Sequence, residues 1–269
     1  MSSRVDGVRV IRRGKVWLVG AGPGDAELLT VRAHRLLAGA RVVAHDELVS
    51  PEILAVAHPD AELIAVGRRA GGCRHHEARI HPLVLERALE GMEVVRLKGG
   101  DPLVFGRGGE EAEELAAARI PFEVVPGISA ALAAAASALI PLTHRECAAS
   151  VTLATAHAAR GEPHVAANVT REGTLVFYMG LARVSETCAA LVAGGRALET
   201  PAAVVSRASL PGERVIVGTL ADMAMRVQEN GAEAPALLIV GEVVARRVPS
   251  VALQETVAST PSRAELRGR

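Results

Sequence analysis

The chain has few aromatic residues, almost no lysine and only three cysteines. Tryptophan, tyrosine and phenylalanine make up 2% of its 269 residues, so its cores must be aliphatic, and the 49% hydrophobic content supplies the material. Lys15 and Lys98 are the only lysines, and arginine provides the remaining positive charge. The cysteines are odd in number and scattered along the chain, so they suggest no disulfide framework, which favours a reducing compartment.

An excess of charge of one sign and long apolar runs are also missing. Thirty basic residues balance thirty acidic ones, which argues against affinity for a nucleic-acid backbone. The longest apolar run, 128–142, contains two serines and a proline and is too short to cross a bilayer. The first residues lack the apolar segment of a signal peptide. We therefore expect a cytoplasmic protein that binds neither nucleic acid nor membrane.

Short apolar runs alternate with segments of helical periodicity, which indicates an α/β fold with mainly parallel sheets. Strands are predicted at 15–19, 41–44, 62–66, 94–98 and 122–125, and again at 151–155, 174–178, 202–206, 214–217 and 236–240. Helices are predicted at 28–37, 80–89, 110–118 and 128–138. The length suits two α/β domains, which we place at 14–135 and 143–246, with disordered tails at 1–13 and 248–269.

Glycine or acidic residues follow every predicted strand of the first half. These turns lie at 20–25 (Gly-Ala-Gly-Pro-Gly-Asp), 45–47, 67–71, 99–102 and 126–127. In open α/β sheets, ligands bind beyond the carboxyl ends of the strands, and glycine lets a ligand approach the backbone closely. One such turn is ordinary, but five at one edge predict a shared ligand site.

The first of these turns is similar to a dinucleotide fingerprint, with Asp46 near the expected place of the ribose-binding acid. However, Asp25 stands where the third glycine belongs, and its carboxylate would repel a pyrophosphate. An adenosine ligand with a sulfonium and no phosphate would tolerate acids such as Asp101. These residues favour S-adenosylmethionine modestly over NAD.

Cysteine and histidine gather at Cys73, His75, His76 and His81. Their spacing matches no standard zinc pattern, so we interpret them as an arginine-rich loop and predict no metal.

Several blocks resemble a known family. The turn at 20–25 with Leu-Leu-Thr at 28–30 looks like the opening of the class III, or tetrapyrrole, methylases. Members that methylate uroporphyrinogen III resemble this chain at 95–111 (Val-Arg-Leu-Lys-Gly-Gly-Asp-Pro-Leu-Val-Phe-Gly-Arg-Gly-Gly-Glu-Glu), 121–129 and 140–145. The resemblance covers roughly 14–246, and Gly-Arg-Gly-Gly-Glu-Glu at 106–111 is its most specific part.

The resemblance implies a homodimer of two-domain α/β chains, each with S-adenosylmethionine in the cleft between its domains. It implies successive methyl transfers to two pyrrole carbons of uroporphyrinogen III, numbered 2 and 7, with S-adenosylhomocysteine as by-product. The product would be precorrin-2, formed via precorrin-1, for sirohaem, cobalamin or haem d1. No dehydrogenase or chelatase region precedes the methylase blocks, so we expect the reaction to stop there.

Site residues are carried over position by position. Cofactor contacts fall on Pro23, Gly99, Gly100, Asp101, Val104, Ser129, Ala130, Met179 and Ala208. Asp46 matches the family's proposed base, and Arg107 and Glu110 compete for substrate binding and proton transfer. An arginine does not readily give up its proton, so we favour Arg107 as a carboxylate clamp. The substrate carries many carboxylates, for which the expected ligands are Arg68, Arg69, Arg107 and Arg145. Met179 is a further expected substrate contact.

Departures from the family pattern gather on the substrate side. Arg68 replaces a usual lysine, His45 a tyrosine, Glu47 an arginine and Ala156 a glycine, and 76–81 also differs. Four alternatives therefore stay open: a methylase of another tetrapyrrole, a ribosomal-RNA methylase of the same fold, an NAD-dependent oxidoreductase, and a non-catalytic tetrapyrrole carrier.

Overall fold

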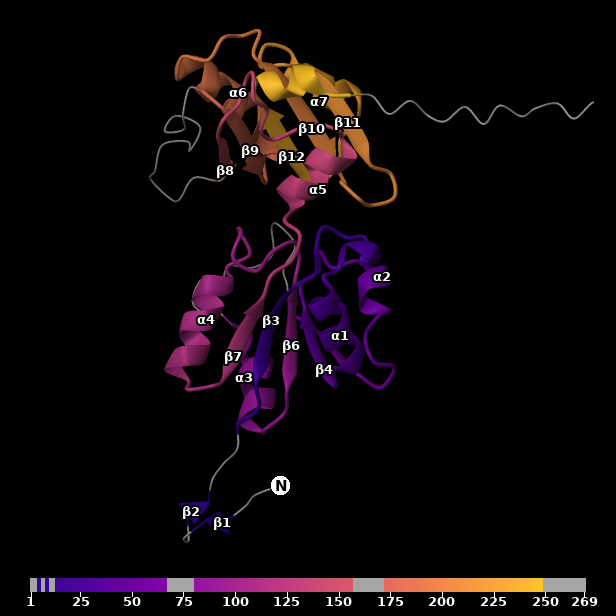
Figure 1. Ribbon diagram of the computed structural model, residues 1–269, viewed down its shortest axis with the longest axis vertical. Coiled ribbons are helices and arrows are strands. Elements are labelled where there is room, and N and C mark those ends of the chain that lie inside the picture. Colours follow the sequence, from indigo (N-terminus) through magenta and orange to yellow (C-terminus); the bar gives the residue numbers. More distant parts are fainter. Residues whose placement is uncertain (1–3, 6–7, 10–12, 67–79, 157–171, 249–269) are drawn as a thin grey trace, which may run out of the picture.

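The computed structural model describes residues 4–5, 8–9, 13–66, 80–156 and 172–248. Figure 1 shows two lobes that follow one another along the longest axis of the molecule, each built on a five-stranded sheet. The predicted fold class, two α/β units, is confirmed.

The first sheet is entirely parallel and has the strand order β5-β4-β6-β3-β7. Its strands lie where the sequence predicts them, at β3 (Val16–Gly20), β4 (Val42–His45), β5 (Glu62–Ala65), β6 (Val94–Lys98) and β7 (Phe122–Val125). Because the strands are parallel, their carboxyl ends meet at one edge, and this edge carries the glycine and acidic turns.

Helices cover both faces of this sheet. On one face, η1 (Ala26–Leu28), α1 (Val31–Gly39) and α2 (Pro51–Leu54) accompany a core that includes Leu37 and Leu97. On the other, α3 (Pro82–Leu89) and α4 (Gly108–Ala117) pack on a core that includes Leu18 and Leu115. Side chains alternate along a strand, so Leu97 faces α1, whereas its neighbours on β6 face α4.

Local sequence sets where these helices begin. The Thr30 hydroxyl accepts a hydrogen bond from the Ala33 N–H (3.2 Å) and caps α1. Ser50 caps α2, which was not predicted, with Pro51 in the first turn. Helix α1 therefore begins at Val31 rather than at residue 28 as predicted, because a 3₁₀ turn and a cap occupy the first residues, and it ends at Gly39 rather than at residue 37.

The second sheet has the order β11-β10-β12-β9-β8. Its strands are again those predicted, at β8 (Val151–Thr155), β9 (Thr174–Tyr178), β10 (Pro201–Ser206), β11 (Arg214–Thr219) and β12 (Ala236–Val240). Only β8 and β9 are parallel; every other pair is antiparallel. The expectation of mainly parallel sheets is wrong here, because the short 207–213 connection makes β10 and β11 a hairpin and leaves no room for a crossover helix.

Helices also flank the second sheet. A core on one face joins it to η3 (Leu181–Arg183), α6 (Val184–Ala193) and α7 (Met223–Glu229), helices that were not predicted individually. A core on the other face holds η4 (Glu242–Arg246) and α5 (Ala130–Ser137). Ala131 and Ala134 of α5 cluster there with Val176 and Val205. This packing places α5 with the second sheet, although the sequence-based division put 130–135 in the first domain.

The predicted tails are described only in part. Within 1–13, β1 (Arg4–Val5) and β2 (Val8–Arg9) pair as two short antiparallel strands. The predicted C-terminal tail lies outside the described residues except for Val248. Of the helices in the described ranges, none has the length and apolarity needed to cross a membrane.

Candidate active site

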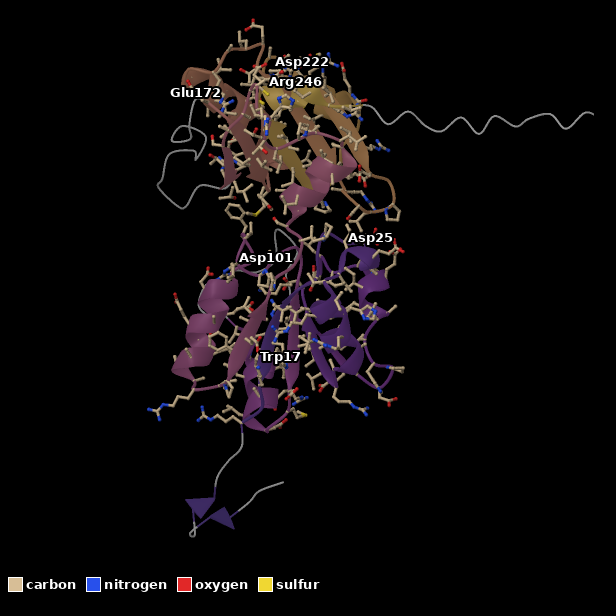
Figure 2. The ribbon with its side chains drawn as sticks, viewed as in Figure 1. Trp17, Asp25, Asp101, Glu172, Asp222 and Arg246 are labelled. Carbon is tan, nitrogen blue, oxygen red and sulfur yellow. The ribbon has the colours of Figure 1, made fainter. Side chains whose placement is uncertain are left out.

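The strand-end turns of the first sheet lie where that lobe faces the second. Figure 2 shows Asp25 and Asp101 at this end, with Trp17 deeper in the same lobe. The turns after β3 and β6 are joined by two backbone hydrogen bonds. The Gly22 N–H donates to the Gly100 carbonyl (3.1 Å), and the Gly100 N–H donates to the Gly22 carbonyl (2.7 Å).

The glycines of these turns have two different tasks. A Cβ on Gly20 would lie 2.5 Å from the Gly127 Cα, and one on Gly127 would lie 2.3 Å from the Gly100 carbonyl oxygen, so both must be glycine for the turns to pack together. In contrast, a Cβ on Gly99 would meet only the Leu48 Cβ, at 3.8 Å. A Cβ on Gly100 would come no closer than 3.7 Å to another group, the Ala130 nitrogen. Gly99 and Gly100 thus leave open space beside the backbone, as close approach of a ligand requires.

The acidic residues of the turns bind backbone groups. Asp101 accepts hydrogen bonds from the Leu103 N–H (2.8 Å) and the Gly127 N–H (3.0 Å), so it joins the turns after β6 and β7. Asp25 accepts the Glu27 N–H (2.8 Å) and caps η1. Both carboxylates therefore shape the turns in which they lie.

Asp46, the predicted base, belongs to a charged network that the sequence analysis did not identify. One guanidinium nitrogen of Arg96 donates to Asp46 Oδ1 (2.5 Å) and to Glu111 Oε1 (3.0 Å). Lys98 Nζ donates to the same Glu111 oxygen (2.6 Å). The side chains of Arg96, Lys98 and Glu111 are each at most 5% exposed, whereas that of Asp46 is 26% exposed. The network thus reaches the surface of the site through Asp46.

Burial is the main cause that lowers the pKa of Lys98 from its usual value, and the charge of Arg96 lowers it further. The carboxylates of Asp46 and Glu111 oppose this shift. The sequence did carry a signal for the network. Arg96 and Lys98 alternate with Leu97 in an otherwise apolar strand, and two buried cations on one face require acidic partners.

Arg107 and Glu110 lie together at the start of α4. Arg107 Nε is 3.5 Å from Glu110 Oε1, and the two side chains are 62% and 46% exposed. Phe105 and Arg107 both have positive φ (54° and 58°), which is rare for side chains of this size and points to a constrained functional loop. The exposed pair can meet a large anionic ligand, whereas the next residue, Glu111, is buried.

Tyr178, at the end of β9, links several predicted cofactor contacts. Its hydroxyl hydrogen-bonds the Ser129 hydroxyl and accepts the Ala131 N–H (3.2 Å). Its ring lies 4.7 Å from that of Phe105, centroid to centroid. Met179 follows with φ 56° and is 50% exposed. The second sheet and the β6–α4 loop therefore meet at Tyr178, which the sequence analysis did not single out.

Other predicted cofactor residues are half-buried: Pro23, Val104, Ala130 and Ala208. Gly24, beside Pro23, packs against Leu210 of the β10–β11 connection, since a Cβ on Gly24 would lie 2.3 Å from that side chain. The two halves of the chain thus also meet at the first turn.

The predicted substrate arginines are not brought together by the described residues. Arg68 and Arg69 lie outside them. Arg145 lines a separate hollow of about 370 Å³ with Thr143, His144, Ala148 and Ala149. Arg107 is therefore the one predicted substrate arginine that the described structure places at the strand-end turns.

Metal ligands are not grouped in the described part of the chain, where no three His, Cys, Asp or Glu residues could hold an ion. Cys73, His75 and His76 lie outside it. His81 caps α3, where its side chain accepts a hydrogen bond from the Leu83 N–H (3.3 Å).

These features define a two-domain α/β protein whose open glycine turns and buried ion network lie at the junction of its lobes. The chain belongs to the tetrapyrrole (corrin/porphyrin) methylase family, whose sequence profile matches residues 15–224.

Curated relatives and solved structures agree with this membership. The chain is 49% identical over 249 residues to a siroheme synthase of Pseudomonas fluorescens (strain Pf0-1), an alignment that covers 92% of this chain and 54% of the relative. A siroheme synthase of Pseudomonas aeruginosa (strain UCBPP-PA14) is also 49% identical, over 90% of this chain and 52% of the relative. The chain thus spans about half the length of the curated relatives that it matches.

A uroporphyrin-III C-methyltransferase from Thermus thermophilus, solved in complex with S-adenosylhomocysteine, is 42% identical. It superimposes with a TM-score of 0.74 over 87% of this chain and 100% of that one. A cobalt-precorrin-4 methyltransferase is 29% identical, with a TM-score of 0.76 over 86% of this chain and 95% of that one.

Proposed function

We propose that the protein transfers methyl groups from S-adenosylmethionine to carbons 2 and 7 of uroporphyrinogen III, giving precorrin-2 via precorrin-1. The observation that carries this proposal is the match in sequence and backbone to the Thermus thermophilus enzyme, over nearly the whole of that chain. Family membership over residues 15–224 supports the same reaction class.

The site fits S-adenosylmethionine. Gly99 and Gly100 leave open space beside the backbone, and Ser129, Ala130 and Met179 lie around Tyr178 on the other side of the junction. The cofactor supplies an electrophilic methyl group on a sulfonium. The protein positions this group against the macrocycle, and correct positioning contributes roughly 7–11 kcal/mol to such reactions.

The macrocycle must lose a proton after methylation, and we assign its acceptance to Asp46. Oδ1 of this carboxylate is held by Arg96, while the side chain is still 26% exposed. Arg107, exposed at the start of α4, is assigned to a substrate carboxylate, because guanidinium binds carboxylates in a bidentate manner. Glu110 would hold Arg107 in place and serve as the second candidate for proton transfer.

The substrate and cofactor assignments are tested by anaerobic incubation of the protein with uroporphyrinogen III and S-adenosylmethionine, followed by mass spectrometry of the tetrapyrrole. We expect a gain of two methyl groups. A macrocycle of unchanged mass, from a protein that binds S-adenosylhomocysteine, would contradict the substrate assignment. Binding of the porphyrinogen without turnover would identify a tetrapyrrole carrier instead.

The residue assignments predict separate defects. Asp46→Asn keeps the shape of the side chain but cannot accept the proton, so turnover should fall by about 10²–10⁴-fold. Arg107→Ala should mainly raise the KM for the macrocycle and leave cofactor affinity unchanged.

A second candidate is methylation of another tetrapyrrole. The backbone superimposes on the cobalt-precorrin-4 methyltransferase with a TM-score of 0.76, although sequence identity is only 29%. The unusual His45 and Glu47 flank Asp46, so the surroundings of the macrocycle differ from those in the family pattern. Incubation with a panel of methylated macrocycles, compared by initial rate, separates the two candidates.

We further propose a cytoplasmic homodimer that acts without nucleic acid or membrane. The balanced charge and the absence of a disulfide framework from the sequence support this location, and the family resemblance supports the dimer. Light scattering coupled to gel filtration should give twice the chain mass of 28.0 kDa.

A further inference from the structure

The ion network behind Asp46 has equal numbers of cations and carboxylates. Arg96 touches both carboxylates through one nitrogen, and Lys98 touches only Glu111. Asp46 and Glu111 therefore compete for the same guanidinium. Arg96 alone would favour the ionised form of Asp46 and make it a weaker base, because an adjacent cation stabilises a carboxylate.

Glu111 opposes this effect, because a second negative charge at the same nitrogen disfavours ionisation of Asp46. Lys98 in turn neutralises part of the charge of Glu111. Glu111 Oε2 is buried and has no hydrogen-bond partner among the described residues, so the cations engage the carboxylate through Oε1 only. The basicity of Asp46 thus depends on two residues that do not touch it.

We propose that Glu111 and Lys98 are positioning residues that set the proton affinity of Asp46 through Arg96, with opposite signs. Within the described residues, the charged and titratable groups around Asp46 are Arg96 and Lys98 of β6, Glu111 of α4, and its chain neighbours His45 and Glu47. His45 Nδ1 lies 3.0 Å from the backbone carbonyl oxygen of Asp46. The proposal rests on the assignment of Asp46 as the proton acceptor.

The identity of Lys98 supports a specific role. All but two of the lysine and arginine side chains in this protein are arginine. The other lysine, Lys15, lies at the opposite end of the sheet, where its Nζ is 3.6 Å from the centre of the Trp17 ring. Lys98 is 2% exposed, so a larger guanidinium at its position would have to displace the groups packed around it. The ammonium of lysine also concentrates its charge at one carboxylate oxygen, whereas a guanidinium spreads its charge over a planar, forked group.

The test compares Glu111→Gln, Lys98→Met and the double variant with the unaltered protein. Charges of like sign that share one guanidinium nitrogen change each other's pKa by on the order of one to two units. Glu111→Gln removes a negative charge and retains the accepting Oε1, so Asp46 should become the weaker base. The acid limb of the pH profile of kcat/KM should then move down by about one unit. Lys98→Met should move it up by a similar amount, and the double variant should return close to the original profile.

A second measurement does not depend on turnover. A carboxyl-carbon NMR titration, with the Asp46 signal assigned from Asp46→Asn, should show the same displacements in the same three variants. If Lys98→Met does not fold, the isosteric Glu111→Gln variant tests the proposal alone, and the titration of Asp46 must then move to lower pH.

Shifts in the same direction for both single variants, or an unmoved Asp46 titration, would overturn the proposal. A purely structural role predicts that the shift does not depend on the sign of the charge that is removed. An inactive unaltered protein with the expected NMR displacements would instead contradict the proposed function and leave the network assignment standing.

Discussion

Replacing Tyr178 with phenylalanine tests how the second sheet orders the cofactor side of the site. Ser129 precedes α5 but makes no side-chain cap bond to the helix, and the Ala131 N–H donates instead to the Tyr178 hydroxyl. Tyr178 therefore caps α5 from a different element. Ala131 is 1% exposed, so removing the hydroxyl leaves its N–H buried without this acceptor.

A buried amide that loses its acceptor costs about 1–3 kcal/mol, and the loss of a helix cap typically costs about 1 kcal/mol. We expect Tyr178→Phe to lower the free energy of unfolding by about 2 kcal/mol. Ser129 directly precedes α5 and Ala130 begins it, and both are proposed cofactor contacts. Affinity for S-adenosylhomocysteine should therefore fall, by tenfold for each 1.4 kcal/mol that ordering of this turn costs on binding.

Urea unfolding gives the stability change, and calorimetric titration with S-adenosylhomocysteine gives the affinity. Phe105→Leu is the matched control, because it disturbs the ring contact at 4.7 Å and leaves the hydroxyl in place. Ser129→Ala should cost less than a usual cap replacement, since this serine makes no cap bond. Unchanged stability and affinity in Tyr178→Phe, or losses no larger than those of Phe105→Leu, would refute the cap.

Three further substitutions have distinct expected outcomes. Gly127→Ala would bring a Cβ to 2.3 Å from the Gly100 carbonyl oxygen, so the melting temperature should fall by several degrees; an unaltered melting curve would contradict the packing. Gly99→Ala meets nothing closer than 3.8 Å, so it should fold normally yet bind S-adenosylhomocysteine more weakly, and equal affinity by calorimetry would show that the cofactor does not approach this backbone. Hydrogen bonds from two basic side chains hold the pKa of Glu123 below its usual 4.5, so its stabilising effect is present above that pH and is lost as the pH falls further. The difference in urea midpoint between the protein and Glu123→Gln should therefore shrink on acidification, and a constant difference would exclude this linkage.

The strands could be predicted from the sequence because each is a short apolar run between turn residues. All ten predicted strands are present within one or two residues of the expected bounds. Strand direction in the second sheet could not be predicted, because whether two strands are parallel depends on the order in which the strands lie side by side in the sheet. β12 lies between β9 and β10, antiparallel to both, and no local pattern in 236–240 specifies that position.

The candidate site was predicted unevenly for a similar reason. Turn glycines are visible in the sequence, but those that serve backbone packing, such as Gly127, look the same as those that leave open space, such as Gly99. Likewise, Glu110 and Glu111 are adjacent acids in one block. Only the direction of α4 decides that the first is exposed and the second is buried against Lys98.

The scarcity of aromatic residues has an optical consequence. Trp17 is the only tryptophan and lies in the first sheet, while Tyr178 is the only tyrosine and lies at the end of a strand of the second. The first lobe therefore contains the single indole chromophore, and the second lobe contains the single phenol. Red-edge excitation selects the indole, and the phenol absorbance can be followed by difference spectroscopy. A single unlabelled sample can thus report whether the two lobes melt together or one after the other.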